Sequence, residues 1–435
     1  MRRAGRAPTA RTLAVLYNEV AGRAKAAMVK RRCRRGWAIR LGLVVALLLA
    51  VACAHRPVAE KQPSPRGAVL VPAHWRDLGS FQDDRDFDGL ASALEGSLAY
   101  YGRLAPDSPL RFGGRTVTVK DYAAGLRWLL TVLRDGGLSA SGKLERIRAR
   151  FDLLRSVGSD GKGGVLFTGY YEPELEGSLT PDARFRYPLY RRPTDLLTID
   201  LGQFPLAMSD RTIVGRLDGD RVVPYFSRGD IDGKGVLDGK GLELLWLDDP
   251  VGIFFLQIEG SGIVRLQNGD EVHVQYDGKN GRPYVSLGRL MIERGLLPKG
   301  KASMQVIRRY LADHPAQLRE MLDLNPSYTF FRIAKDGPFG NIGVALTPGR
   351  SIATDSRLFP KGALCLIRTE EPELASDGHA KAWKPFTRFV CNQDTGGAIT
   401  GPGRVDLFWG AGEKAEASAG LLQQPGSLYF LVPKG

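Results

Sequence analysis

The residues best suited to chemistry lie near the C-terminus, in the glycine-rich stretch 392-NQDTGGAITGPGRVDLFWGAG-412, which carries Asp394 and Asp406. A third aspartate, Asp355, lies upstream in 351-SIATDSRLFPKG-362. A carboxyl group in a partly desolvated site can donate and accept protons, so each is a candidate general acid or base. Aspartate is also common in turns, where it accepts hydrogen bonds from backbone amides. A purely structural role for each of the three therefore stays open.

Asp394 begins an Asp-Thr-Gly tripeptide, the sequence that houses the catalytic carboxylate of aspartic proteases. Protease chemistry of that kind needs two carboxyl groups that share one proton, from two such loops or from a dimer of half-sized chains. This chain has 435 residues, one Asp-Thr-Gly and no Asp-Ser-Gly. An aspartic protease is therefore strongly disfavoured.

Most of the positive charge lies at the N-terminus. The chain carries 61 Lys and Arg against 47 Asp and Glu, a net charge of +14. Residues 1–40 hold twelve of the basic residues and one acidic residue, which leaves a nearly balanced body of 49 and 46. A nucleic-acid-binding domain would keep its charge in the body, so no nucleic-acid partner is expected. The length and the apolar content of 43% are those of a globular protein with about two domains.

Residues 1–53 have the form of an export leader. A basic run, 30-KRRCRRGWAIR-40, precedes the apolar 41-LGLVVALLLAVAC-53, which is shorter than the roughly 20 residues that span a bilayer. Met28 would give a start of more ordinary length. The small residues before Cys53 resemble a lipobox, in which that cysteine is lipidated, and plain cleavage beside an incidental cysteine is the alternative. The Pro-rich stretch that follows suits a tether, and we assign residues 54–74 to a linker.

Cysteine and histidine are too sparse for a zinc site. The five histidines are scattered without ligand spacing, so we expect no metal and no cofactor. Cys365 and Cys391 are the two cysteines beyond Cys53. In the oxidising compartment that export implies, they fit either a disulfide or two buried thiols.

Hydrophobic periodicity predicts a mainly β fold with packed helices (α+β). Helical spacing of apolar residues, with Ser141 as an N-cap and Gly158 as a stop for the third helix, appears over 87–104, 122–135, 141–158, 285–296 and 303–322. β-rich segments punctuated by Gly, Asp and Pro cover 165–178, 187–193, 213–228, 252–266, 328–333, 341–349, 388–392, 404–410 and 427–433. This order indicates two barrel-like modules with helices around them.

Five blocks, in order, resemble one family of exported cell-wall proteins. The blocks 342-IGVALTPGRSIATDSRLFPKG-362 and 394-DTGGAITGPGRVDLFWGAG-412 resemble the three-aspartate double-psi β-barrel domain. The blocks 168-TGYYEPELEGS-178, 246-WLDDPVGIFFLQIEGSGIVRL-266 and 277-DGKNGRPYVSLGRLMIERG-295 resemble the other half of the membrane-bound lytic murein transglycosylase A family.

The resemblance implies a domain arrangement. The helical segment 75–164 and the segment 326–435 would form the double-psi barrel domain. A second barrel, 165–325, would be inserted into it, and the groove between the two would hold a glycan strand. The protein would be exported to the periplasm and associated with the outer membrane through lipidated Cys53. Its other partners would be cell-wall remodelling proteins.

The resemblance also implies roles for particular residues. Asp406 would be the acid and base, with Asp394 and Asp355 in support. Thr168, Tyr170, Tyr171, Gln257 and Ser261 would bind the glycan, although strand alternation favours one tyrosine pointing into the barrel. The sequence departs from the family at Glu259, where Gln is more usual. Phe408 and Trp409 could wall the site or belong to the core, and Lys279, Asn280 and Tyr284 could bind or only turn the chain.

The implied reaction is cleavage of the MurNAc–GlcNAc β-1,4 bond of peptidoglycan without water, which leaves 1,6-anhydro-MurNAc ends. One aspartate would suffice, because the C6 hydroxyl of the sugar replaces the water that glycosidases activate with a second carboxylate. Two alternatives remain: a non-catalytic peptidoglycan-binding lipoprotein, and a hydrolytic muramidase. The hydrolase would need a second carboxylate opposite Asp406.

Overall fold

Six strands close into a barrel in the computed structural model, which describes residues 68–204, 212–299, 302–375 and 379–434. The hydrogen-bonded order is β19-β16-β17-β15-β18-β5, and β5 pairs again with β19. Of the neighbouring strands in this barrel, β15 runs parallel to β17 and β18 runs parallel to β5. The other neighbours are antiparallel. The strands are β5 (Val165–Glu172), β15 (Ser351–Ala353), β16 (Leu364–Leu374), β17 (Ala380–Asp394), β18 (Arg404–Ala411) and β19 (Gln423–Pro433).

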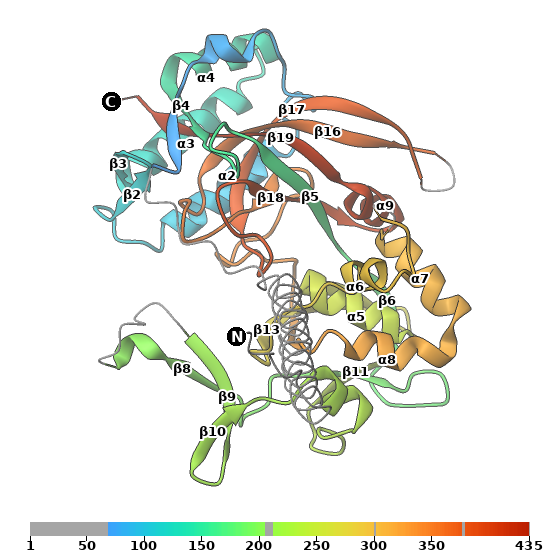
Figure 1. Cartoon of the computed structure of the whole chain (residues 1–435). Coiled ribbons are helices and arrows are strands. Elements are labelled where there is room, and N and C mark those ends of the chain that lie inside the picture. Colours follow the sequence, from blue (N-terminus) through green and yellow to red (C-terminus); the bar gives the residue numbers. More distant parts are fainter. Residues whose placement is uncertain (1–67, 205–211, 300–301, 376–378, 435) are drawn as a thin grey trace, which may run out of the picture. The chain divides into compact units, whose positions relative to one another are not determined.

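The N-terminal part of the described chain packs around this barrel (Figure 1). Two strands extend the sheet beyond β19, and the helices share one large apolar core with the barrel strands. The elements are β1 (Leu70–Ala73), η1 (Trp75–Leu78), α2 (Leu90–Tyr101), β2 (Pro109–Phe112), β3 (Arg115–Thr118), α3 (Val119–Arg134), α4 (Ala140–Arg150) and β4 (Phe151–Ser156). The fold thus already includes Leu70–Ala73, which the sequence assigns to the linker. The predicted leader and Cys53 lie outside the described residues.

A buried ion pair ties the N-terminal part to the barrel. Arg350, just before β15, donates to both carboxylate oxygens of Asp83 at 2.7 and 2.8 Å. Both side chains are fully buried. The amide of Phe389 on β17 also donates to Asp83, at 2.9 Å. A buried charge pair of this kind needs such additional hydrogen bonds to offset its desolvation.

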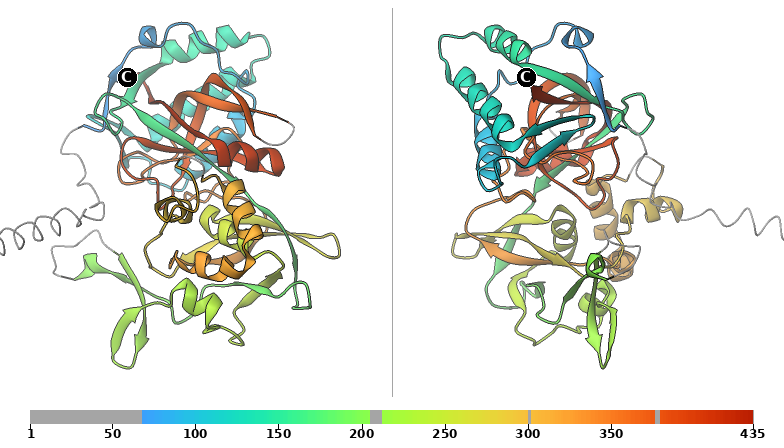
Figure 2. Two further views of the ribbon diagram at one scale, coloured as in Figure 1. Left: turned by 45° about the vertical axis from the view of Figure 1, so that its right-hand side comes forward. Right: turned by 90° about the vertical axis from the view of Figure 1, so that its left-hand side faces the viewer.

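The chain between β5 and β15 forms a second sheet, in the order β14-β13-β12-β6-β11-β7, whose two ends meet at a bridge between Arg191 and Phe331. A three-stranded sheet, β10-β9-β8, stands beside it (Figure 2). The strands are β6 (Glu174–Ser178), β7 (Tyr187–Tyr190), β8 (Leu197–Asp200), β9 (Thr212–Asp218), β10 (Arg221–Pro224), β11 (Glu243–Leu247), β12 (Ser261–Leu266), β13 (Glu271–Lys279) and β14 (Thr329–Ala334). The helices of this region, with α9 that follows β18, are η2 (Leu201–Gln203), η3 (Gly229–Gly233), α5 (Pro250–Glu259), α6 (Leu287–Glu293), α7 (Met304–Asp313), η4 (Pro315–Gln317), α8 (Leu318–Asp323) and α9 (Glu413–Leu421).

The predicted strand over 252–266 is wrong in its first half, where α5 is found. The side chain of Asp249 caps this helix by accepting a hydrogen bond from the amide of Val251 at 2.9 Å, and Pro250 occupies its first turn. Gly260 ends it in the left-handed conformation at φ +89°. An unbroken apolar run fits a buried helix as well as a buried strand, so periodicity alone could not decide.

Three further element predictions need correction. The helix predicted over 141–158 ends at Arg150, is capped by Ser139 and not Ser141, and gives way to β4, which pairs with β1 and β19. The segment 341–349 is a loop and not a strand. Pro315 divides the helix predicted over 303–322 into α7, a 3-10 turn and α8, because proline cannot continue a helix.

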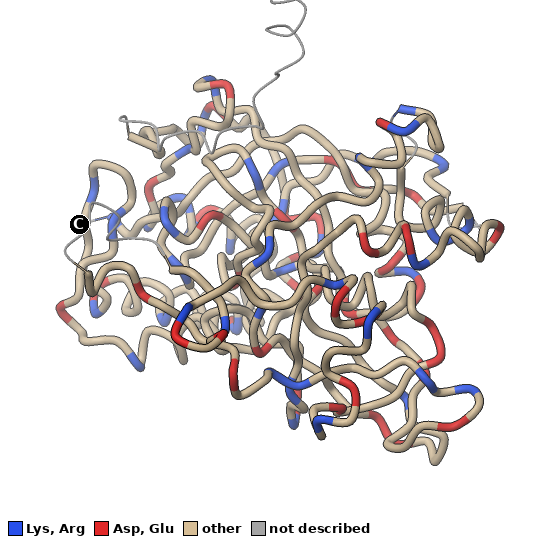
Figure 3. Tube along the Cα trace, turned by 60° about the horizontal axis from the view of Figure 1, so that its bottom comes forward, with Lys and Arg blue, Asp and Glu red and all other residues tan. Residues whose placement is uncertain are grey.

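The described residues also bear on the predictions about the cysteines, the charge distribution and the fold class. Cys365 and Cys391 are both buried free thiols. Acidic and basic residues are interspersed along the trace in Figure 3, in keeping with the balanced charge of the body. None of the helices in these ranges has the length and apolar character needed to cross a bilayer. The prediction of a mainly β fold with packed helices, and of one barrel inserted into another, is confirmed.

Candidate active site

Strand register brings the predicted acid and its neighbours into one row across the barrel. On parallel strands β18 and β5, Asp406 lies opposite Thr168. On the other side of β18, Asp406 lies opposite Ala353 of β15, which in turn faces Asp394 of β17. Residues more than 200 positions apart therefore meet because the ladder aligns them.

Asp406 is half-buried and sits in a short chain of hydrogen bonds. The hydroxyl of Thr168 donates to its Oδ1 at 2.7 Å, and Arg404 donates to that hydroxyl at 3.3 Å. Burial raises the pKa of Asp406 to about 6, and the nearby charge of Asp394 adds to this, while Thr168 and Arg404 oppose it. Asp406 is thus a carboxyl group that can hold a proton in mildly acidic solution and release it close to neutrality.

Asp394 faces the same site but is more firmly held. Its carboxylate accepts hydrogen bonds from the Tyr170 hydroxyl at 3.1 Å and from the amides of Asn341 and Thr395 at 2.8 Å each. Burial raises its pKa, and these donors oppose the rise. Lys361 donates to the backbone oxygen of Asp394. These contacts fix the loop at the end of β17 and the ring of Tyr170 at the same time.

The structure does not bring Asp355 into this row. Its buried carboxylate is paired with the guanidinium of Arg357 at 2.6 Å and accepts from the Gly401 amide at 2.8 Å. Burial alone would raise the pKa of Asp355, but these partners hold it below its usual value. Asp355 is absent from the lining of the cavity that holds Asp394 and Asp406, and it braces the loop around Gly401.

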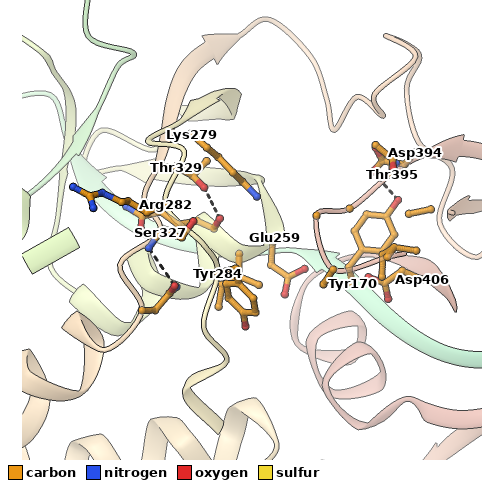
Figure 4. A pocket seen from close by; sticks show the side chains of 18 of the residues that line it. Tyr170, Glu259, Lys279, Arg282, Tyr284, Ser327, Thr329, Asp394, Thr395 and Asp406 are labelled. Carbon is orange, nitrogen blue, oxygen red and sulfur yellow. Dashed lines mark hydrogen bonds between the residues drawn. The ribbon is translucent and has the colours of Figure 1, made fainter. Parts of the chain in front are cut away.

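Asp394 and Asp406 line a cavity of about 380 Å³ between the barrel and the inserted region (Figure 4). What we call the barrel wall consists of Gly169, Tyr170, Ala353, Asp394, Thr395, Gly396, Gly397, Ala398, Ile399 and Asp406. What we call the insert wall consists of Arg228, Gln257, Ile258, Glu259, Lys279, Arg282, Tyr284, Asn325, Ser327 and Thr329. Two neighbouring cavities, of about 440 and 640 Å³, share Ile258 and Glu259 with it. The three cavities together give a long cleft suited to an extended ligand.

The predicted glycan-binding residues divide into cleft and core. Tyr170 lines the cleft, whereas Tyr171 is buried. One of the two is buried, as alternation predicts, but it packs among apolar side chains of the insert helices and α9 and not inside the barrel. Ser261 lines the cavity next to the central one. Gln257 is buried on the insert wall, and both polar atoms of its amide lack a hydrogen-bond partner among the described residues. A buried amide without partners is costly, so hydroxyl or acetamido groups of a ligand would satisfy it.

Close packing behind the row explains Gly169, which lies between Thr168 and Tyr170. A Cβ at this position would lie 2.6 Å from the indole nitrogen of Trp409 and 2.7 Å from the backbone of α9 at Ala419. Phe408 is buried and packs on Tyr170 with ring centroids 5.2 Å apart. Neither Phe408 nor Trp409 lines the cavity, so both belong to the core and support the site from behind.

Glu259 is a cleft residue that sequence reasoning noted only as a departure from the family. It ends α5 and lines all three cavities. In Figure 4 the side chain of Glu259 lies between those of Tyr284 and Asp406. Burial raises its pKa well above the usual value, and the charge of Asp406 contributes. The sequence shows that a glutamate stands at position 259. It does not show that this residue lies opposite Asp406, because that position depends on packing between two segments far apart in the chain.

Lys279 and Tyr284, left open between binding and turn roles, both line the cleft. Asn280 is buried and structural: its side-chain amide donates to the backbone oxygens of Phe226 and Pro326, at 2.8 Å each. No group of three or more His, Cys, Asp and Glu in the described ranges could hold a metal ion. The cleft therefore presents carboxyl groups, an aromatic ring and an unpaired amide, a set suited to acid–base chemistry on a sugar polymer.

Comparison with known proteins identifies the family. Residues 166–332 match the family model described as "MltA specific insert domain", and residues 350–432 match "3D domain". The chain is 34% identical over 279 residues to membrane-bound lytic murein transglycosylase A of Vibrio cholerae, across 63% of this chain and 67% of that protein. The chain belongs to the membrane-bound lytic murein transglycosylase A family.

Solved structures of this family share the architecture. A membrane-bound lytic murein transglycosylase from Agrobacterium tumefaciens is 33% identical, with a TM-score of 0.68, over 84% of this chain and 97% of that one. Escherichia coli MltA with bound chitohexaose is 25% identical, with a TM-score of 0.64, over 87% and 100%. The double-psi barrel with a second barrel inserted and a groove between them, predicted for this family from the sequence, is confirmed.

Proposed function

We propose that this peptidoglycan lytic transglycosylase cleaves the MurNAc–GlcNAc β-1,4 bond with Asp406 as its single acid and base. Family membership supports the enzyme class and the glycan strand as its ligand. The observation that carries the assignment to Asp406 is its position: a half-buried carboxyl in the cleft, with a raised pKa and one side-chain hydrogen bond from Thr168.

The reaction balances with one carboxyl group. Protonated Asp406 donates its proton to the glycosidic oxygen as the bond from that oxygen to C1 of MurNAc breaks. The C6 hydroxyl of the same sugar then attacks C1 and closes the 1,6-anhydro ring. The Asp406 carboxylate takes the proton from this hydroxyl, which restores the acid for the next cycle. Thr168, held by Arg404, keeps the carboxyl oriented through both transfers.

Asp394 and Asp355 act in support by different routes. Asp394 positions Tyr170 and the loop over the cleft through its hydrogen bonds, and its negative charge helps to keep the proton on Asp406. Asp355 acts at a distance, through the Gly401 loop that precedes β18. Tyr170, Gln257 and Ser261 contact the glycan, whereas Tyr171 holds the insert in place from the core.

Hydrolysis is the second candidate reaction. It is favoured by the presence of a second carboxyl group, that of Glu259, in the cleft. A muramidase needs a carboxylate on the far side of the scissile bond to activate water, and Glu259 lies in the same cleft as Asp406. A base must be ionised, however, and burial keeps the pKa of Glu259 well above its usual range. Protonated Glu259 presents a neutral polar group, as a glutamine would, and this favours the reaction without water.

Membrane attachment and domain limits complete the proposal. The relatives are named membrane-bound, and we place this chain in the periplasm, attached to the outer membrane through lipidated Cys53. The limits predicted from the sequence are 54–74 for the tether, 75–164 and 326–435 for the double-psi barrel domain, and 165–325 for the insert. We move them, because β1 and β5 pair within the sheet of the barrel domain and β14 pairs within the sheet of the insert. Mass spectrometry of the mature N-terminus would test the lipid, because plain cleavage leaves an unmodified peptide.

Product analysis tests the central step. Purified sacculi are digested with residues 54–435, and with the Asp406→Ala variant as a control, and the released muropeptides are analysed by mass spectrometry. We expect products that end in 1,6-anhydro-MurNAc, absent with the variant. Reducing ends would indicate a hydrolase. Binding to sacculi without any release would indicate the non-catalytic lipoprotein.

A further inference from the structure

A lysine in the cleft, Lys279, has no acidic partner among the residues that the structure describes. Lys279 ends β13 and lines both the central cavity and the neighbouring one that holds Ser261. Figure 4 shows its side chain pointing into the space between the two walls. A Cβ built on Gly397 would lie 3.6 Å from its ammonium nitrogen, so the charge reaches the loop that follows Asp394 on the opposite wall.

Local structure holds Lys279 in this place. A bulge in the pairing of β13 with β14 precedes it, at Tyr276 and Gly278. The next residue, Asn280, is fully buried and fixes the turn through hydrogen bonds to two other segments, one at Phe226 and the other at Pro326 and Tyr328. The backbone of Lys279 is fixed in this way, and its ammonium lies 6.0 Å from the centre of the Tyr276 ring at the end of a long aliphatic stem, which suits a ligand-binding cation.

The other cations of the insert wall are already engaged. Arg228 is buried, donates to the backbone oxygens of Asn325 and Ser327, and pairs with Asp232 at 3.5 Å. Arg282 donates to the backbone oxygen of Tyr225 at 2.8 Å. In contrast, no carboxylate of the described residues lies within 4 Å of the Lys279 ammonium. Burial without such a partner lowers the pKa of Lys279, which means that a bound anion would stabilise its charged form.

We propose that Lys279 forms an anion subsite, which binds a carboxylate carried by the glycan strand. This inference rests on the proposed function, because a peptidoglycan strand supplies such groups. In a stem-free strand, each MurNAc carries a lactyl carboxylate. In a stem-bearing strand, the lactyl group is an amide and the carboxylates belong to the peptide. A chitooligosaccharide has the same backbone and no carboxylate, so the subsite would distinguish the murein strand from its uncharged analogue.

The test compares three ligands in variants that cannot turn them over. In an Asp406→Asn background, dissociation constants are measured for chitohexaose, stem-free glycan strands and stem-bearing strands. The same measurements are made after adding Lys279→Gln, Lys279→Arg, or the control Lys120→Gln, which removes an exposed charge outside the cleft. We expect Lys279→Gln to weaken binding of a carboxylated strand about tenfold or more, the size of one charge-assisted hydrogen bond. Chitohexaose binding should change less than about twofold, and Lys279→Arg should restore most of the loss.

The outcomes test the anion subsite and the proposed function separately. A loss confined to stem-free strands identifies the lactyl group as the source of the carboxylate, and a loss confined to stem-bearing strands identifies the peptide. Equal losses on all three ligands, or no loss on any, would overturn the subsite. If the parent Asp406→Asn protein binds no strand at all, the proposed function fails first. The preference for carboxylated strands should also shrink as salt screens the pair.

Discussion

The two walls of the cleft are built in different ways. On the barrel wall, strand register sets the positions of Asp406 and Asp394, and it places Thr168 beside Asp406 as its support. On the insert wall, Lys279 and Glu259 stand at the ends of a strand and a helix. There the backbone is held by buried side chains such as Asn280 and Arg228.

The difference assigns separate tasks to the two walls. Proton transfer needs a carboxyl group held within a few tenths of an ångström, and a barrel ladder supplies that rigidity. Recognition of a long polymer needs many contacts of moderate precision, and strand ends and helix ends can supply these. We therefore expect substitutions on the barrel wall to lower kcat and those on the insert wall to raise KM or Kd.

The largest effect should come from Asp406→Asn. An isosteric amide keeps the shape of the site and removes the proton donor, so kcat on sacculi should fall about 10³-fold or more. Circular dichroism and thermal unfolding should show an intact fold. A variant that retained more than about a tenth of the activity would remove Asp406 from the catalytic step and break the assignment of chemistry to the barrel wall.

The next largest effect should come from Asn280→Ala, at a residue that lies behind the insert wall and supports it. Asn280 donates to Phe226 and Pro326 and accepts from the amides of Arg282 and Tyr328. Its loss leaves several buried backbone groups unpaired, at a cost of about 2–4 kcal/mol in the free energy of unfolding. KM should rise about tenfold with kcat nearly unchanged, and the exposed Gln267→Ala is a matched control. A fall in kcat alone would contradict the division between the walls.

A smaller effect of Asp406→Asn should appear in the pH dependence of the free energy of unfolding. The folded-state pKa of Asp406 is raised to about 6, from an ordinary value near 3.8, so the stability associated with its protonated form is present at low pH and lost as pH rises through 6. Asp406→Asn removes this loss. The variant should be more stable than the wild type by about 1–3 kcal/mol at pH 8, and the difference should vanish below about pH 4. Urea unfolding at both pH values checks it, and equal differences at the two would contradict the raised pKa.

The smallest effect should come from Asp355→Asn. The amides of Gly401 and Arg357 donate to different oxygens of the Asp355 carboxylate, so the single amide oxygen of asparagine keeps one of these two bonds. The lost ion pair has a partner that is 59% exposed. Exposed pairs contribute about 0–1 kcal/mol. Activity should stay within about threefold of the wild type and the unfolding free energy within about 2 kcal/mol. A loss as large as that of Asp406→Asn would give Asp355 a direct part in the reaction.

The sequence predicted the barrel wall better than the insert wall. Asp394 and Asp406 drew attention because they stand in a glycine-rich motif, and the family resemblance pointed to Thr168 and Tyr170. Alternation along β5 predicted that one of the two tyrosines points into the barrel, but not which one; Tyr171 is the buried one, and it packs against helices of the insert and α9. The insert wall was less predictable. The apolar run before Glu259 reads equally as strand or helix, and only the cap at Asp249 and the turn at Gly260 decide it. That Lys279 has no acidic partner in the described part of the chain depends on tertiary packing, which the local sequence does not contain.

Incorporation of oxygen from labelled water tests most directly the central claim, that Asp406 alone catalyses cleavage without water. Sacculi are digested in H₂¹⁸O by the wild type and by Glu259→Gln, and the MurNAc ends are analysed by mass spectrometry. A reaction closed by the C6 hydroxyl, with Asp406 alone as acid and base, leaves anhydro ends without ¹⁸O in both proteins. Reducing ends that carry ¹⁸O in the wild type, and that disappear in Glu259→Gln, would contradict it and make Glu259 the base of a hydrolase.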